Sequence, residues 1–286
     1  MIRKLTWNQM QNQSDLILSD GLSKLKTSDF LNVEEIKNEK YQGNYLITLN
    51  KQPYYIGEGK DIYKRIKQQF KSKTSTFYKN YRELYLIKQN DIPIDKFKIQ
   101  VISTNIGRKE IEEFGIVNFP TRLNKFQLDK RNQFVIQDQK GIWDNVQNNY
   151  LELLKTAENN IMNLKFVPWN DNPVVNTAGI YIIKDKLDTI IYIGESSNVY
   201  ERISVHSNRT YFSALRRHIG TDILGYTLLE NKGRTRYFSP IEDNKITGFL
   251  KSCKVISVPI CFGRFELEEY LIRKYRPMLN RKENKE

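Results

Sequence analysis

Two stretches of alternating apolar and polar residues, far apart in the chain, each predict a β-hairpin that leads into a helix. Residues 179–203 read GIYIIKDKLDTIIYIGESSNVYERI, in which two β-rich runs flank the polar turn KDKLD. Residues 43–66, GNYLITLNKQPYYIGEGKDIYKRI, have the same form. After each YIG comes a polar cap, and apolar residues four apart then indicate the buried face of a helix.

Further along the chain, each hairpin is followed by a third β-rich run and a second helix. The third strands are expected at 97–103 (FKIQVIS) and 253–260 (CKVISVPI). The second helices begin at Glu-Glu pairs and stop near Pro120 and Pro277, because proline cannot continue a helix. The pattern therefore predicts an α+β protein with two small three-stranded antiparallel sheets, each flanked by helices.

The two sets of elements form an internal repeat. With one gap in the turn, identical residues align in both hairpin stretches: Gly43, Tyr45, Tyr55, Ile56, Gly57, Glu58, Tyr63, Arg65 and Ile66 in the first copy, and Gly179, Tyr181, Tyr192, Ile193, Gly194, Glu195, Tyr200, Arg202 and Ile203 in the second. The later blocks EEFGIVNFPTRLN (112–124) and EEYLIRKYRPMLN (268–280) also match. Two matching blocks in the same order indicate two copies of one domain.

The repeat divides the chain into four parts. They are an N-terminal segment at 1–40, a first repeat domain at 41–127, a helical linker at 128–173, and a second repeat domain at 174–286 with an insert at 207–250. Apolar residues at helical spacing over 144–164 predict one bridging helix that packs on both domains. The N-terminal segment is polar and gives no indication of chemistry.

The charge of the chain favours a polyanionic partner. The sequence has 46 Lys and Arg against 33 Asp and Glu, a net charge of +13. Basic residues interleave with aromatic ones after each hairpin, which is typical of a phosphate-tracking surface, although a solvated helix face is the alternative. The candidate DNA-binding residues are Lys60, Lys64, Lys67, Lys71 and Lys73 in the first copy, and Arg209, Arg216, Arg217, Arg234 and Arg236 in the second.

Composition excludes several other classes of protein. Only two cysteines and two histidines are present, so a disulfide framework, a four-cysteine zinc site and a three-histidine zinc site are ruled out. Cys253 and Cys261 are interpreted as buried thiols. No stretch approaches the roughly 20 apolar residues of a membrane span, and the polar start lacks the apolar core of a signal peptide. We therefore expect a soluble cytoplasmic protein.

The ordered motifs of the second copy resemble those of the GIY-YIG nuclease superfamily. They are G-I-Y at 179–181, Y-I-G at 192–194, and the downstream Arg, His, Glu and Asn. The resemblance covers most of both copies and implies a metal-dependent DNA endonuclease. It implies the catalytic set Tyr181, Tyr192, Arg202, His206, Glu268 and Asn280, with Glu268 as the metal ligand.

This set of residues suits phosphodiester hydrolysis, because the reaction needs an activated water and stabilised charge on the phosphoryl oxygens. Arg202 presents donors that match a phosphate, and His206 lies one helical turn later on the same face. One carboxylate suits Mg²⁺, with Mn²⁺ as a substitute, because Mg²⁺ keeps several waters. The resemblance gives Tyr181 the role of positioning or deprotonating the water, supported by Tyr192. To act as a base, Tyr181 would need nearby cations to lower its pKa from the reference value of about 10. We expect Asn280 to brace the second helix.

The first copy carries most of the same set. Its matching residues are Tyr45, Tyr55, Arg65, Gln69, Glu112 and Asn124, with Glu112 as the metal ligand. Gln69 stands where the second copy has His206, and an amide cannot transfer a proton. Asn44 stands where the family has Ile, and we expect it to be tolerated if it faces out of the strand.

Structural interpretations of these residues stay open. Tyrosines favour strands in general, and His206 is also interpretable as a structural histidine. Glu113 and Glu269 are alternative ligands beside Glu112 and Glu268. The spacing to the later asparagine favours the first glutamate of each pair.

The leading functional hypothesis is a Mg²⁺-dependent endonuclease that acts on double-stranded DNA. Two catalytic units in one chain suit a restriction-type or defence enzyme that cuts both strands as a monomer. The first alternative is a structure-specific or nicking nuclease in which only the second site is active. The second alternative is a non-catalytic DNA-binding module.

Overall fold

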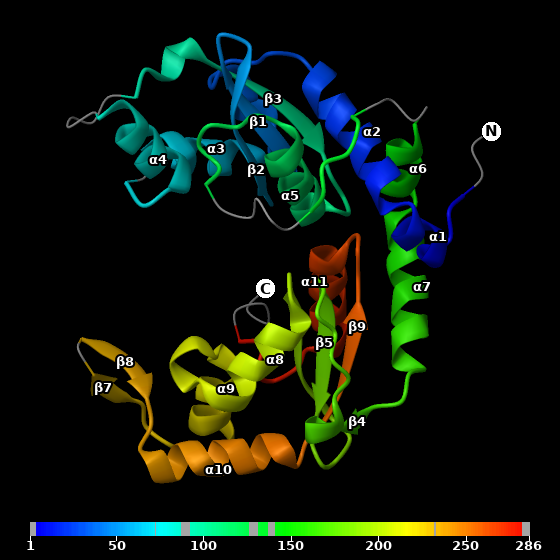
Figure 1. The fold of residues 1–286 in the computed structure, drawn as a ribbon, viewed down its shortest axis with the longest axis vertical. Coiled ribbons are helices and arrows are strands. Elements are labelled where there is room, and N and C mark those ends of the chain that lie inside the picture. The colour runs from blue at the N-terminus through cyan, green and yellow to red at the C-terminus, as the bar shows by residue number, and fades with distance from the viewer. Residues whose placement is uncertain are drawn as a thin grey trace. The chain divides into compact units, whose positions relative to one another are not determined.

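The computed structural model describes residues 4–71, 73–86, 92–125, 131–136, 141–231 and 233–281. Its helices and antiparallel strands form two compact units, Met1–Leu153 (the N-terminal unit) and Leu154–Glu286 (the C-terminal unit) (Figure 1). The boundary lies inside helix α7 (Tyr150–Met162). The mixture of helices and antiparallel sheets agrees with the α+β class that the sequence predicts.

The N-terminal unit is built on a three-stranded antiparallel sheet in the order β2-β1-β3. Its strands are β1 (Gly43–Leu49), β2 (Gln52–Gly59) and β3 (Phe97–Ser103). Helices α3 (Ile62–Lys71) and α4 (Thr76–Tyr85) lie on one side of the sheet, and α2 (Ser14–Thr27) lies on the other (Figure 1). Helix α5 (Arg108–Asn118) packs on β2 and ends two residues before Pro120.

The sequence pattern suggested a separate segment at residues 1–40. In the structure, these residues are instead part of the N-terminal unit. Helix α1 (Trp7–Asn12) precedes α2, which buries Ile17, Leu18 and Leu22 completely. Helix α2 packs on β1, β3 and α5, so it is part of the core of the N-terminal unit. Two short 3₁₀ helices, η1 (Glu35–Asn38) and η2 (Ile94–Lys96), complete the connections.

The C-terminal unit repeats the same sheet with one addition. Strands β5 (Gly179–Lys184), β6 (Ile190–Ser196) and β9 (Lys254–Pro259) have the order of their N-terminal counterparts. A two-residue strand, β4 (Val167–Pro168), extends the sheet to the order β4-β9-β5-β6. The sequence predicted three strands, because a two-residue strand leaves no alternating pattern to detect.

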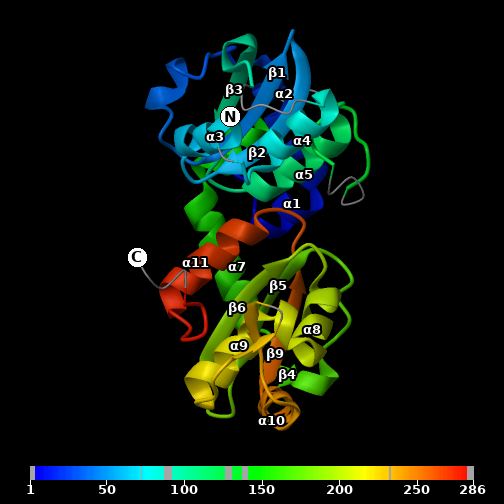
Figure 2. The same ribbon diagram turned by 90° about the vertical axis from the view of Figure 1, so that its left-hand side faces the viewer.

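Helices cover both faces of the C-terminal sheet. Helix α8 (Val199–Asn208) and helix α11 (Arg264–Tyr275) lie on opposite sides of it (Figure 2). The insert at 207–250 contains η4 (Thr210–Phe212), α9 (Ala214–His218), η5 (Ile219–Ile223), the hairpin β7 (Leu229–Asn231) and β8 (Arg234–Tyr237), and α10 (Pro240–Lys251). Leu215, Ile219 and Ile246 from this insert join the core on the α8 side.

The predicted bridging helix is two helices. Helix α6 (Ile142–Asn148) belongs to the N-terminal unit, where it packs on α2, and α7 begins at Tyr150. In the C-terminal unit, the buried carboxylate of Glu158 on α7 accepts hydrogen bonds from Tyr270 (3.0 Å), Lys274 (2.8 Å) and Tyr275 (2.5 Å). This cluster fixes α7 against α11.

Candidate active site

Strand register places the two motif tyrosines of the C-terminal unit side by side. Tyr181 lies opposite Gly194, and Tyr192 lies opposite Ile183, so both tyrosine side chains leave the same face of the β5–β6 pair. Their rings stack with centroids 6.0 Å apart. A Cβ atom at Gly194 would lie 2.3 Å from the Tyr181 hydroxyl. The glycine of YIG is therefore required by the ring of the GIY tyrosine.

The glycine of GIY has a different steric cause. A Cβ atom at Gly179 would lie 2.1 Å from the backbone carbonyl oxygen of Val258 on β9. A backbone atom cannot move aside as the end of a flexible side chain can, so only glycine permits β5 and β9 to approach this closely.

The Tyr181 hydroxyl is hydrogen-bonded to a buried histidine. Its oxygen lies 2.8 Å from Nε2 of His206, and Nδ1 of that ring lies 2.7 Å from Oγ of Ser213. Ser213 also accepts the backbone N–H of Arg216 (3.0 Å) as the N-cap of α9. Burial holds the pKa of His206 well below its usual value, and the cations of Arg202 and Arg216 add to this effect. His206 is therefore neutral at physiological pH and carries one ring proton.

Burial also controls the state of the tyrosine. It raises the pKa of Tyr181 well above 10, and the neighbouring Tyr192 raises it further, while Arg202 opposes the shift without cancelling it. The cation of Arg202 lowers the pKa as the sequence analysis required of a base, but burial outweighs it and the net shift is upward. Tyr181 is a protonated phenol in the resting site.

Arg202 and Glu268 complete the cluster from two different helices. The half-buried Arg202 on α8 interacts with the hydroxyls of Tyr181 and Tyr192. Glu268 on α11 acts electrostatically on Tyr181, and its Oε1 accepts the backbone N–H of Glu195 (2.9 Å) at the end of β6. The structure thus brings these side chains together.

Asn280 holds the strand that carries Tyr192. Its side-chain oxygen accepts the N–H of Ile193 (3.0 Å), and its side-chain N–H₂ donates to the carbonyl of the same residue (2.8 Å). Both polar atoms therefore bind the backbone of β6. Asn124 makes the same pair of bonds to Ile56 in the N-terminal unit (2.9 and 3.0 Å).

The geometry of the C-terminal site agrees with a family comparison. Residues 177–284 match the family model described as the GIY-YIG catalytic domain. The match lies wholly within the C-terminal unit, covers less than half of the chain, and indicates an endonuclease. No curated protein and no solved structure matches the chain.

The N-terminal unit has the same backbone arrangement as the GIY-YIG domain. Tyr45 lies opposite Gly57, Tyr55 lies opposite Ile47, and the two tyrosine rings stack at 6.3 Å. Arg65 and Glu112 both act electrostatically on Tyr45. The tyrosine pair, the arginine and the glutamate therefore converge in this unit also.

The partner of the tyrosine hydroxyl differs between the units. Nε2 of Gln69 donates to the Tyr45 hydroxyl (3.0 Å), and its Oε1 accepts the N–H of Phe77 (3.3 Å). An amide nitrogen does not titrate at physiological pH, so Tyr45 receives a proton donor. In the C-terminal unit, Nε2 of the neutral His206 accepts from Tyr181 in the tautomer that carries its proton on Nδ1.

The candidate metal ligand of the N-terminal unit is paired with a lysine. Nζ of Lys109 lies 2.9 Å from Oε2 of Glu112, one turn away on α5. Burial lowers the pKa of Lys109, but the nearby glutamates outweigh it and the pKa lies above its usual value, so the ammonium is charged. The matching residue in the GIY-YIG domain is Phe265. A lysine–glutamate pair therefore occupies the N-terminal position at which the family places a metal ligand.

We expected Asn44 to be tolerated if it faced out of its strand, but its side chain lies inside the core. It is completely buried, and its side-chain N–H₂ donates to the carbonyl oxygens of Arg108 (2.8 Å) and Gly57 (3.4 Å). The polar residue is tolerated because the start of α5 supplies acceptors inside the core.

Each unit contains an arginine–glutamate pair that the sequence motifs did not predict. Nε of the buried Arg264 lies 2.9 Å from Oε2 of Glu195, and Nη1 of the buried Arg108 lies 3.7 Å from Oε2 of Glu58. The signal was present, because the repeat extends back to Gly-Arg pairs at 107–108 and 263–264. Each glycine has a positive φ (94° and 82°) and caps the following helix.

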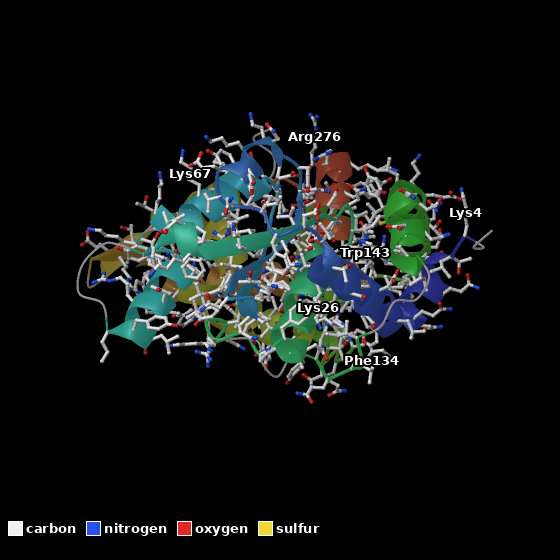
Figure 3. All side chains as sticks on the ribbon, turned by 90° about the horizontal axis from the view of Figure 1, so that it is seen from above. Lys4, Lys26, Lys67, Phe134, Trp143 and Arg276 are labelled. Atoms are coloured by element: carbon white, nitrogen blue, oxygen red, sulfur yellow. The ribbon has the colours of Figure 1, made fainter. Side chains whose placement is uncertain are left out.

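The predicted DNA-binding lysines are exposed, and Lys67 lies on another face of α3 than Arg65. Lys67 and Lys71 line a pocket of about 570 Å³ together with Tyr63, Glu34 and other residues. Tyr63 and Lys67 each lie two positions from Arg65 on α3, which is a rotation of about 200° around the helix axis. Figure 3 shows the Lys67 side chain pointing outward from the unit. Lys60, Lys64 and Lys73 are also exposed.

The predicted DNA-binding arginines divide into three groups. Arg209, Arg234 and Arg236 are exposed. Arg217 is half-buried and donates to the carbonyl oxygens of Thr210 and Tyr211.

Arg216 is completely buried, so the expectation that it contacts DNA is wrong. Its guanidinium is paired with Asp243 (3.0 Å) and donates to the backbone oxygens of His206 (3.2 Å) and Ser207 (2.9 Å). Arg216 therefore holds the insert against α8.

The donor set limits which metal ion fits the GIY-YIG domain. Within the described part of the chain, no cluster of three or more His, Cys, Asp or Glu is arranged to hold a metal. The single oriented carboxylate of Glu268 fits a Mg²⁺ ion that keeps most of its waters, and it does not fit a structural zinc site.

No helix among the described residues is long and apolar enough to cross a membrane.

Proposed function

We propose that the protein is a Mg²⁺-dependent endonuclease of double-stranded DNA, and that its C-terminal GIY-YIG domain hydrolyses the phosphodiester bond. The observation that carries this proposal is the 2.8 Å hydrogen bond between Tyr181 and the neutral His206, beside Arg202 and Glu268. A protonated phenol in contact with a desolvated base is arranged to pass a proton.

The residues of the GIY-YIG domain have distinct roles in this proposal. Arg202 binds the scissile phosphate through its guanidinium, close to the two tyrosine hydroxyls. Tyr181 orients the attacking water and accepts one of its protons while it gives its own proton to Nε2 of His206. The water oxygen forms the new bond to phosphorus as the bond to the leaving oxygen breaks. Glu268 would hold the Mg²⁺ ion, which supplies charge stabilisation to the phosphoryl oxygens.

We assign no cleavage to the N-terminal unit. Gln69 cannot accept a proton from Tyr45, and Lys109 neutralises the carboxylate of Glu112. With one cutting site in the chain, the expected product of a single encounter is a nick. The exposed lysines of this unit supply attraction to the phosphate backbone.

A second candidate is a restriction-type or defence enzyme that cuts both strands with two sites. The observation in its favour is that Tyr45, Tyr55, Arg65 and Glu112 keep the arrangement of the GIY-YIG domain. In that case the Lys109–Glu112 pair would have to open when DNA and Mg²⁺ bind.

Cleavage of supercoiled plasmid with Mg²⁺ separates these candidates. The wild type, Glu268→Gln and Glu112→Gln are compared on DNA from several sources. We expect nicked circles from the wild type and from Glu112→Gln, and a loss of about 10³-fold in rate for Glu268→Gln. Linear product from the wild type, with nicks from each single variant, would establish two sites. Binding of DNA without cleavage of any of it would leave only a DNA-binding module.

A further inference from the structure

Aromatic rings form half of the lining of a pocket in the insert of the GIY-YIG domain. Its volume is about 440 Å³, and its walls include Tyr211, Phe212, Tyr237 and Phe238. Tyr211 is the centre of the group, with ring centroids 4.7 Å from Phe212 and 5.5 Å from Tyr237. Phe212 is 60% exposed, so its ring is accessible to a ligand.

Arg209 and the acidic Asp243 also line the pocket, and two further arginines lie beside the Tyr211 ring. The guanidinium carbons of Arg234 and Arg236 lie 5.8 and 5.4 Å from the centroid of the Tyr211 ring. Both arginines come from β8, which forms a hairpin with β7 at the edge of the unit (Figure 1). Burial lowers the pKa of Arg217, and the cations of Arg236 and Arg202 lower it further. The arginines therefore form a positively charged path from the catalytic Arg202 to the hairpin.

The pocket is directly connected to the catalytic centre. Phe212 belongs to the 3₁₀ turn η4, which follows α8 after one residue. Nη1 of Arg202 donates to the carbonyl oxygen of Phe212 (3.5 Å). A phosphate bound by Arg202 would therefore place its own nucleoside next to the exposed Phe212 ring.

We propose that this pocket holds one unstacked nucleobase of the strand that is cut, and that the enzyme consequently prefers DNA with an unpaired base. This proposal rests on the proposed function, because it places the scissile phosphate on Arg202. Aromatic rings interleaved with arginines are the surface that binds the faces of unpaired bases. A base inside a continuous helix has no exposed face, so it must leave the stack, and this is easiest when it has no partner.

The test compares two duplexes that differ by one unpaired adenine. Dissociation constants are measured by fluorescence anisotropy without divalent metal, so that no cleavage occurs. For the wild type we expect binding to the bulged duplex to be tighter by about tenfold. Phe212→Ala and Tyr237→Ala should each bring the ratio of the two constants close to one, while Phe212→Tyr should keep it.

The matched control is Tyr200→Ala. Tyr200 is an exposed aromatic residue of α8, two positions from Arg202 and therefore on another face of the helix. This variant should retain the full preference of the wild type. The exposed position of Phe212 ensures that its alanine variant folds, which thermal unfolding checks.

Two results would overturn the nucleobase pocket. They are equal binding of both duplexes by the wild type, and a preference that persists in both Phe212→Ala and Tyr237→Ala. If the protein still nicks plasmid DNA in either case, only the pocket is refuted. Failure to bind and to cleave any DNA would instead refute the proposed function.

Discussion

The two tyrosine sites share the same strand arrangement and differ in the side chain that is hydrogen-bonded to the tyrosine hydroxyl. In both units the GIY tyrosine lies over the YIG glycine, and an asparagine clamps the outer strand. The hydroxyl of Tyr181 faces the base His206, whereas the hydroxyl of Tyr45 receives an N–H of Gln69. The backbone framework is therefore maintained separately from proton transfer.

The carboxylates show the same division. Glu268 is oriented by a backbone N–H of β6, whereas Glu112 is paired with the ammonium of Lys109. A fixed ammonium provides the positive charge that a metal ion would otherwise supply, but it has no open coordination positions for water or phosphate. In the function proposed above, the differences at positions 69 and 109 separate a nuclease-like fold from nuclease chemistry.

The largest expected effect comes from giving the GIY-YIG domain the amide of the N-terminal unit. His206→Gln should lower the nicking rate by about 10²- to 10⁴-fold, because the proton of Tyr181 loses its acceptor. The rate is measured at saturating Mg²⁺. His218→Gln is the matched control, since His218 is bonded to the carbonyl oxygen of Leu279 (2.8 Å) away from Tyr181, and its rate should stay within about twofold. Equal rates in the wild type and His206→Gln would remove the proposed difference between the units.

The pH dependence of the rate provides a second test of the same residue. Because burial and the cations of Arg202 and Arg216 hold the pKa of His206 below 6.5, the ring stays neutral as the pH falls from 7.5 to 6.5. The nicking rate should therefore be flat over this interval and should decline only at lower pH. A rate that halves near pH 6.5 would show an unperturbed, solvated histidine.

Alanine at the YIG glycines should give similar losses of stability and unequal losses of activity. A Cβ atom would lie 2.3 Å from the Tyr181 hydroxyl at Gly194 and 2.4 Å from the Tyr45 hydroxyl at Gly57. Each variant should lose about 1–3 kcal/mol of unfolding free energy by overpacking. Only Gly194→Ala should also lose nicking activity. Calorimetry and plasmid cleavage measure the two effects, and equal activity losses would indicate that both sites cut.

The packing of helix α7 on helix α11 depends on the buried carboxylate of Glu158. Burial raises the pKa of Glu158, but the bonds from Lys274, Tyr275 and Tyr270 outweigh it and hold the pKa below 4.5. The stabilisation is therefore complete above pH 4.5 and is lost as the pH falls through the lower folded-state value. Glu158→Gln should cost about 2 kcal/mol at pH 7 and progressively less below pH 4.5. Unfolding by urea at several pH values measures this difference, and a constant difference at all pH values would contradict it.

The smallest expected effect concerns metal binding by the N-terminal unit. Lys109→Phe introduces the residue that the GIY-YIG domain has at this position, and it leaves Glu112 without its ammonium partner. The affinity of this site for Mn²⁺ should rise by about tenfold, so that calorimetric titration without DNA detects a second ion. Lys64→Phe, on the exposed face of α3, should leave the number of ions unchanged. One bound ion in both variants would show that Lys109 does not exclude the metal.

Much of the scaffold could be predicted because it depends on local patterns. Alternation with period two located the hairpins, and the shared offset of four placed His206 on the same face as Arg202. The hairpins and the shared face follow from the periodicity of strands and helices. Glu268 was assigned to the site by the resemblance to the GIY-YIG superfamily, because a repeated downstream block does not by itself show which side chains meet.

The rest depends on tertiary burial, which single residues do not reveal. Arg216 looks like any exposed arginine in sequence, yet it is the buried anchor of the insert. Ser213, which orients His206, comes from a loop with no recognisable spacing. The direction of the Tyr181 pKa shift could not be predicted for the same reason, because its charged neighbours are visible in the sequence and its desolvation is not.

The asparagine clamps also protect the open edges of both sheets. Strands β6 and β2 are edge strands, whose outward N–H and C=O groups would otherwise recruit a strand from another molecule. In the C-terminal unit Leu279 donates to the carbonyl of Ile191 (3.1 Å), and Asn280 occupies both polar groups of Ile193. A chain that ends before residue 279 would lose this cover, and its exposed edge would favour self-association.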